Sequence, residues 1–165
     1  MEWYRRAAES GSVEAEHNLG MMYVGGKGVA KSWSQGLMHF RKAAARGLVE
    51  SRYMIALSYF EGEGQIQNRR LALEGFRETA AEGYPDSQYM LSFILLDGND
   101  TKAKPAQALV WASLALSQGQ AQGEEIRDAA LLRLDDQDID DAQFVLSQCA
   151  ARGLRSCLPA IETLP

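Results

Sequence analysis

The sequence contains few of the residues that most catalytic and metal sites need. Its 165 residues include only two histidines and two cysteines. Neither residue type shows ligand spacing such as Cys-x-x-Cys or His-x-x-x-His, so the sequence gives no support for a zinc site. It also lacks a Gly-x-Ser-x-Gly elbow, a Gly-rich phosphate loop of the P-loop kind, and any serine followed three residues later by lysine. We therefore expect no catalytic residue, no metal and no cofactor, and we expect that the protein is not an enzyme.

Long apolar runs and an excess of positive charge are also missing. No stretch approaches the ~18 uncharged apolar residues of a membrane span, and the first residues hold no apolar signal segment. The 17 basic and 22 acidic residues give a net charge of −5, which repels phosphate. Both a nucleic-acid partner and a membrane span are therefore disfavoured.

Proline is scarce, with four residues, and β-branched residues are sparse, which favours helices. Glycine, in contrast, occurs 15 times, more than a plain helical bundle would carry. Four of these glycines are spaced 36 residues apart: Gly11, Gly47, Gly83 and Gly119. The same step relates Tyr4, Phe40 and Phe76; Ala8, Ala44 and Ala80; and Leu19, Ile55 and Leu91. A fixed period of this length is typical of repeat architectures.

Each 36-residue unit is predicted to hold two helices, because apolar residues recur at helical spacing, as in Leu37, Phe40 and Ala44. The Gly11 column is expected to end the first helix of each pair, and the Gly-x-Gly pairs to end the second. The predicted helices span 2–10, 13–24, 35–46, 49–60, 70–82, 86–96, 106–118, 122–134, 136–151 and 155–163.

A single helix pair cannot bury its own apolar face, so we expect neighbouring pairs to stack. The predicted fold is an all-α, right-handed α/α solenoid, or superhelix, of about four and a half helix pairs with a concave groove. Residues 1–165 are expected to form a single domain, in which residues 124–165 are an atypical C-terminal cap.

Three stretches of the sequence carry a family resemblance: residues 7–11 (AAESG), 15–23 (AEHNLGMMY) and 25–29 (GGKGV). Together they resemble the Sel-one-like repeat (SLR) family of the tetratricopeptide-like superfamily. The match weakens along the chain, since Gly20 is replaced by Ala56 and Ser92. The resemblance implies a non-catalytic adaptor or scaffold for protein–protein interaction. An enzyme of unfamiliar type that uses His17, Glu50 and Asp86 is the remaining alternative.

Cys149 and Cys157 lie eight residues apart, in repeat columns that elsewhere hold pairs of small residues. If those columns touch, the two cysteines lie within disulfide range. The cysteine-rich bacterial branch of the SLR family carries a disulfide at this spacing, which implies a bridge here. The alternative is a pair of reduced, buried thiols in a cytosolic protein. The bridge would favour a periplasmic or exported protein, whereas Met1 without a signal segment favours the cytoplasm.

The resemblance also implies a partner site, because the helix with the Leu-Gly-x-x-Tyr pattern lines the groove of such solenoids. The residues expected to face the groove are Glu14, His17, Met21, Glu50, Tyr53, Leu57, Phe60, Asp86, Tyr89 and Phe93. Aromatic side chains provide large contact areas, and carboxylates attract basic groups. We therefore predict a protein or peptide partner with basic residues. Two alternatives stay open: the aromatic side chains pack between units, or the chain is a self-associating module, either a homodimer or a fragment of a longer repeat protein.

Overall fold

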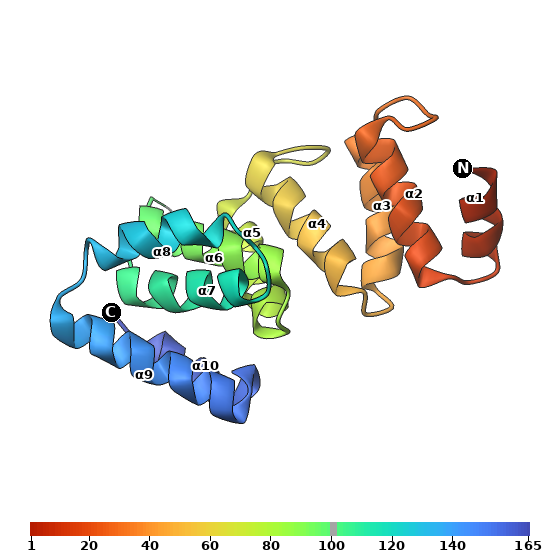
Figure 1. Cartoon of the computed structure of the whole chain (residues 1–165). Helices are drawn as coiled ribbons and strands as arrows, with labels where there is room; N and C mark the ends of the chain where they lie inside the picture. Colours follow the sequence, from red (N-terminus) through yellow and green to blue (C-terminus); the bar gives the residue numbers. More distant parts are fainter. Residues whose placement is uncertain (100–101) are drawn as a thin grey trace. The chain divides into compact units, whose positions relative to one another are not determined.

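The computed structural model describes residues 1–99 and 102–165, and within these residues it consists of α-helices joined by short turns, without a β-strand (Figure 1). The helices are α1 (Glu2–Glu9), α2 (Val13–Gly25), α3 (Trp33–Ala44), α4 (Val49–Glu61), α5 (Arg69–Ala81), α6 (Pro85–Asp97), α7 (Pro105–Ser117), α8 (Gly123–Leu131), α9 (Asp136–Arg152) and α10 (Leu154–Thr163). In this part of the chain, no helix combines the length and the hydrophobicity that crossing a bilayer requires.

All ten predicted helices are confirmed, and their ends differ from the prediction by at most three residues. Helix α3 begins two residues earlier than predicted because the Ser32 hydroxyl accepts a hydrogen bond from the Gln35 backbone N–H at 3.3 Å and caps the helix. Helix α8 ends at Leu131 instead of residue 134, where the chain forms a tight turn.

The repeated glycines end the helices as the sequence predicted. Gly26 and Gly62 cap α2 and α4 in the left-handed conformation, with φ of 65° and 78°. The 36-residue column that begins at Gly11 has φ between 91° and 94° in the turns that follow α1, α3, α5 and α7. Residues with a Cβ rarely adopt these angles, which explains why the same residue returns at a fixed step.

The chain forms two compact units, residues 1–75 and residues 76–165, and the boundary falls within α5. In the first unit, Leu37, Phe40 and Met54 form a buried cluster. Partly buried side chains of α2, α3 and α4 surround this cluster: Val24, Trp33, Tyr53, Ile55 and Leu57. Apolar burial between successive helices therefore stabilises this unit.

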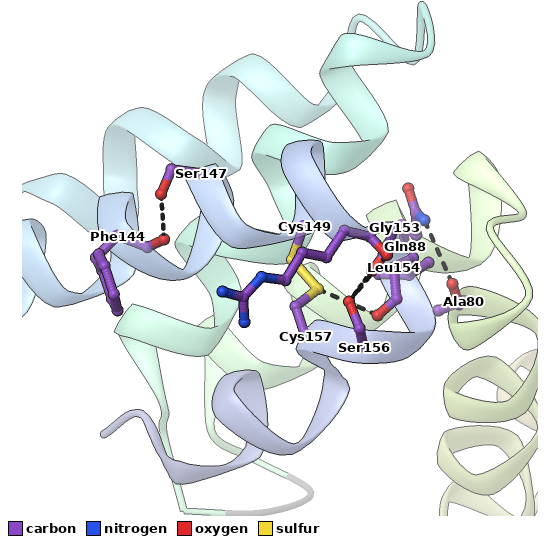
Figure 2. The surroundings of a disulfide bond; sticks show 10 residues. Ala80, Gln88, Phe144, Ser147, Cys149, Gly153, Leu154, Ser156 and Cys157 are labelled. Atoms are coloured by element: carbon purple, nitrogen blue, oxygen red, sulfur yellow. Dashed lines mark hydrogen bonds between the residues drawn. A yellow bond between two sulfur atoms is a disulfide. The ribbon is translucent and has the colours of Figure 1, made fainter.

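In the second unit, α6 packs against α7, α7 against α8, and α9 against α10. The α9–α10 hairpin turns at Gly153, and a disulfide joins Cys149 and Cys157 across it, with Cα atoms 5.2 Å apart (Figure 2). The end of the chain also contacts α7. The Ala106 backbone N–H donates to the Pro165 carbonyl at 3.1 Å, and the Gln107 amide donates to the Leu164 carbonyl at 2.9 Å.

Candidate functional site

The residues predicted to face a groove lie on α2, α4 and α6, the three helices that carry the Leu-Gly-x-x-Tyr columns. Those on α2 and α4 belong to the first unit, and we call them the α2–α4 face: Glu14, His17, Met21, Glu50, Tyr53, Leu57 and Phe60. Those on α6 belong to the second unit: Asp86, Tyr89 and Phe93. Each set is described within its own unit.

His17 joins α2 to α4. Its Nδ1 atom lies 2.9 Å from the Ser51 hydroxyl, and its ring lies 5.4 Å from the Phe40 ring, centroid to centroid. Burial lowers the pKa of His17, and the negative charge of Glu50 partly opposes this effect. The surroundings therefore favour a neutral imidazole that hydrogen-bonds between two helices.

Glu50 has an unusual environment at the start of α4. Glu50 as a whole is half-buried, but its Oε2 atom is buried and has no hydrogen-bond partner among the described residues. Leaving a buried carboxylate oxygen without a donor costs free energy, about 1–3 kcal/mol or more for a charged group. Because the Glu50 residue as a whole is only half-buried, a change of its side-chain rotamer would present this acceptor to a donor from another molecule.

The equivalent carboxylate of the next repeat has a partner within the chain. Asp86 lies 36 residues after Glu50, and its Oδ1 atom accepts a hydrogen bond from the Gln120 amide. On the same helix Tyr89 is half-buried, and the Phe93 side chain is 39% exposed. The set on α6 therefore offers an apolar contact without an unsatisfied carboxylate oxygen.

Some aromatic and aliphatic side chains of the α2–α4 face make contacts within the first unit. Tyr53 and Leu57 pack against the buried cluster of Leu37, Phe40 and Met54. The Arg69 guanidinium lies over the Phe60 ring at 4.0 Å from its centroid, in cation–π geometry.

Glu14 and Met21 are more open to solvent than these aromatic residues. Glu14 is exposed, and Met21 is 41% exposed. The accessible part of the α2–α4 face is thus an acidic and apolar surface, and its aromatic residues also support the core.

Sequence reasoning missed a polar network that joins α2 to α3. His39 Nδ1 lies 2.6 Å from Glu16 Oε2, and Lys42 Nζ lies 3.4 Å from Glu16 Oε1. The His39 ring also stacks on Tyr23, with centroids 5.4 Å apart. Glu16 lies 23 residues before His39 and on another helix, and no periodic pattern in the sequence indicates that pairing.

No metal site accompanies these residues: within the described ranges, no group of three His, Cys, Asp or Glu side chains could hold an ion. The two histidines contact different helix pairs, because His17 bonds to α4 and His39 bonds to α2. The two histidines therefore serve separate contacts between helices.

A comparison with protein-family models matches the Sel1 repeat to residues 1–12, 13–48, 49–84 and 85–120. The chain belongs to the Sel1 repeat family. The resemblance inferred from the sequence is therefore confirmed, and the all-α architecture is an α solenoid of Sel1 repeats. In these matches a full Sel1 repeat begins with the helix that carries the Leu-Gly-x-x-Tyr pattern. Residues 13–48, for example, hold α2 and then α3.

Two solved structures share the Sel1 architecture. A Sel1 repeat protein from Oxalobacter formigenes is 25% identical, with a TM-score of 0.66, covering 76% of this chain and 94% of that chain. A protective antigen of uropathogenic Escherichia coli strains that displays an SLR fold is 24% identical, with a TM-score of 0.67. That alignment covers 98% of this chain and 40% of the antigen, and it shows the fold alone. No curated protein matches this chain.

Sel1 repeat proteins are generally scaffolds for protein–protein interaction, and the family is generally non-catalytic. Membership thus gives the broad class of function for this chain. The partner and the binding surface have to be argued from the residues themselves.

Proposed function

We propose that this chain is a non-catalytic scaffold that binds a protein or peptide segment with basic side chains on the α2–α4 face. The basic group would approach Glu50, and apolar side chains of the partner would contact Met21 and Tyr53. Family membership supports the scaffold role, and the choice of face and partner chemistry is our inference from the side chains.

The buried Glu50 Oε2 atom is the observation on which this proposal depends. It has no donor among the described residues, whereas the equivalent Asp86 carboxylate accepts a hydrogen bond from Gln120. A lysine or arginine of a partner would supply a charge-assisted hydrogen bond to this oxygen. Binding would then remove the cost of an unsatisfied acceptor, which makes this position more selective for cations than an exposed carboxylate is.

Two further features support a basic partner. Glu14 is an exposed carboxylate on the same face, and the whole chain carries a net charge of −5. Negative potential of this kind accelerates the approach of a cationic segment. The exposed Met21 side chain provides an adaptable apolar contact.

A panel of fluorescein-labelled 12-residue peptides tests the proposal by fluorescence polarisation. The peptides share their apolar residues and carry lysine, arginine or glutamate at the charged positions. We expect saturable binding of the lysine and arginine peptides, and at least fivefold weaker binding of both to Glu50→Gln.

The control variant is Glu63→Gln, which removes the same charge from an exposed loop position of the same unit. It should bind the basic peptides nearly as well as the parent chain. Equal losses for Glu50→Gln and Glu63→Gln would mean that only net charge matters, and the proposed site would be rejected. Preference for the glutamate peptide would reject the partner chemistry.

Self-association is the second candidate function, and helix α1 gives the observation that favours it. Tyr4 is 42% exposed, whereas Phe40, at the same repeat position in the same unit, is fully buried. The neighbouring Trp3 is 81% exposed, and α1 contains no buried residue. A second copy would cover this apolar surface. Sedimentation equilibrium tests this: a dimer that becomes monomeric in Trp3→Ala favours self-association, and a monomer at all concentrations excludes it.

A further inference from the structure

The second unit contains a pocket that is separate from the α2–α4 face and independent of the function proposed above. It lies between α5, α6, α7 and α10 and has a volume of about 350 Å³. We call it the α5–α7 pocket, and the lining residues used below are Arg77, Leu91, Lys104, Trp111, Leu158 and Glu162. This volume is at the lower end of the range for small-molecule sites.

The inner wall of the pocket is apolar. Leu91 belongs to the core of the unit, and the Trp111 side chain is only 5% exposed. Leu158 of α10 completes this wall. A flat indole with two leucine side chains suits an alkyl chain or an aromatic ring.

Two cations line the same pocket without internal partners. Among the described residues, neither the Arg77 guanidinium nor the Lys104 ammonium makes a hydrogen bond or an ion pair. Glu162 also lines the pocket and is ion-paired to neither of them. The pocket therefore combines two unpaired positive charges with one carboxylate, in a chain whose net charge is −5.

The first unit has a repeat-equivalent pocket, which serves as an internal comparison. It lies 72 residues earlier in the sequence, with Arg5 at the position of Arg77 and Leu19 at the position of Leu91. In that pocket one cation, Lys42, has a partner: Glu16 accepts from Lys42 at 3.4 Å, and its other carboxylate oxygen lies 2.6 Å from His39.

The second unit has lost the acids of this equivalent pocket. Glu9 is replaced by Ala81, and Glu16 is replaced by Gln88. The buried Gln88 amide donates to the Ala80 carbonyl at 3.3 Å, a contact drawn in Figure 2, and it carries no charge to neutralise Arg77. In place of His39 the second unit has Trp111. These replacements remove negative charge and add apolar surface at the same place.

We propose that the α5–α7 pocket binds a carboxylate that is joined to an apolar chain or ring. The carboxylate would lie between Arg77 and Lys104, where charge-assisted hydrogen bonds to both are available. The apolar body would contact Trp111 and Leu158. Such a group occurs in a small organic acid and at the carboxyl end of a peptide with an apolar last residue.

The probe is 4-phenylbutyrate, compared with its neutral amide, and binding is followed by ¹⁵N NMR at the indole N–H of Trp111. We expect the acid to shift this resonance in a saturable way and the amide to bind at least tenfold more weakly. Arg77→Gln and Lys104→Gln should each weaken binding of the acid at least threefold. Arg5→Gln, the matched change in the equivalent pocket, should leave it unchanged.

A gain-of-acid variant gives an independent test, because Ala81→Glu restores the carboxylate that the equivalent pocket has at this position. This change should abolish binding of the acid while the circular dichroism spectrum remains helical. Peptides that end in phenylalanine, with a free or an amidated carboxyl end, distinguish a small organic acid from a peptide end as the source of the carboxylate. The proposal holds if the free-carboxyl peptide, the small acid or both bind through Arg77 and Lys104. Equal binding of acid and amide, or unchanged binding in both glutamine variants, would overturn it.

Discussion

The ring of Phe40 on α3 lies directly against the backbone of Gly20 on α2, where no room is left for a second side chain. A Cβ atom at position 20 would lie 2.5 Å from Phe40 Cε1. Atoms cannot approach so closely, and the fully buried Phe40 ring has little room to move.

We therefore predict that Gly20→Ala destabilises the protein. Alanine favours helix over glycine by ~1 kcal/mol, but overpacking costs about 1–3 kcal/mol, so the free energy of unfolding should fall by up to about 2 kcal/mol. Urea unfolding followed by circular dichroism measures this change.

Gly25→Ala is the matched control in the same helix. A Cβ there would meet only the Lys27 side chain, at 3.6 Å or more, and the position is exposed. This variant should be as stable as the parent chain or more stable. If Gly20→Ala is equally stable, the Phe40 ring does not lie against the Gly20 backbone.

The disulfide between Cys149 and Cys157 should stabilise the α9–α10 hairpin. The two residues are eight apart, and closing a loop of that size removes chain entropy worth about 2.5 kcal/mol from the unfolded state. Cys149→Ser/Cys157→Ser should lose about this much free energy of unfolding. The parent chain in reducing buffer should show the same loss, and no loss in either condition would contradict the stabilising role.

A thiol reagent added to denatured, unreduced protein from the native host counts free cysteines directly. We expect none, since both sulfurs are bonded to each other. This result would support the location that the bridged cysteine pair favours, an oxidising compartment such as the periplasm. Two free thiols per chain would contradict it and favour the cytoplasm.

His17 should make stability depend on pH. Its pKa is lowered by burial in the folded state, so the unfolded chain binds a proton more readily than the folded chain does. The neutral His17 side chain contributes fully to the free energy of unfolding above the unfolded pKa of about 6.5. This contribution is lost as the pH falls below that value towards the folded pKa. The free energy of unfolding should therefore fall between pH 7 and pH 5.

His17→Gln isolates this effect, because glutamine can still bond to Ser51 but does not titrate. Its unfolding free energy should decline less than that of the parent chain over the same pH range. Glu14, whose pKa is lowered mainly by a backbone hydrogen bond, loses its contribution only below about pH 4.5. If the unfolding free energies of the parent chain and His17→Gln change in parallel with pH, His17 is not the group responsible.

The fold could be predicted from the sequence because its main determinants repeat. Gly47 and Gly83 recur where the backbone needs a positive φ, and Phe40 and Phe76 recur where a ring fills the core. Each requirement acts on a single position that recurs from unit to unit, so it leaves a 36-residue period. The start of α3 and the end of α8 differ from the predicted positions because they depend on a local cap and a local turn that do not recur with the period.

The candidate site could be predicted only in part, because pairing between helices leaves no period. Glu50 and Asp86 are equivalent in sequence, but only Asp86 has a partner, Gln120, and the residue at the corresponding place for Glu50 is Tyr84. The bond between His17 and Ser51 likewise depends on how α2 and α4 meet. Sequence patterns select α2, α4 and α6 as candidate helices, whereas the contacts between helices determine which carboxylate is unsatisfied.

The most direct test of the scaffold account is NMR mapping of the lysine peptide on the ¹⁵N-labelled chain. We predict that the largest amide shifts during titration cluster at His17, Glu50 and Tyr53, on α2 and α4, and that they disappear in Glu50→Gln. Shifts confined to α1, α3 or the second unit, or shifts that persist in Glu50→Gln, would contradict the account.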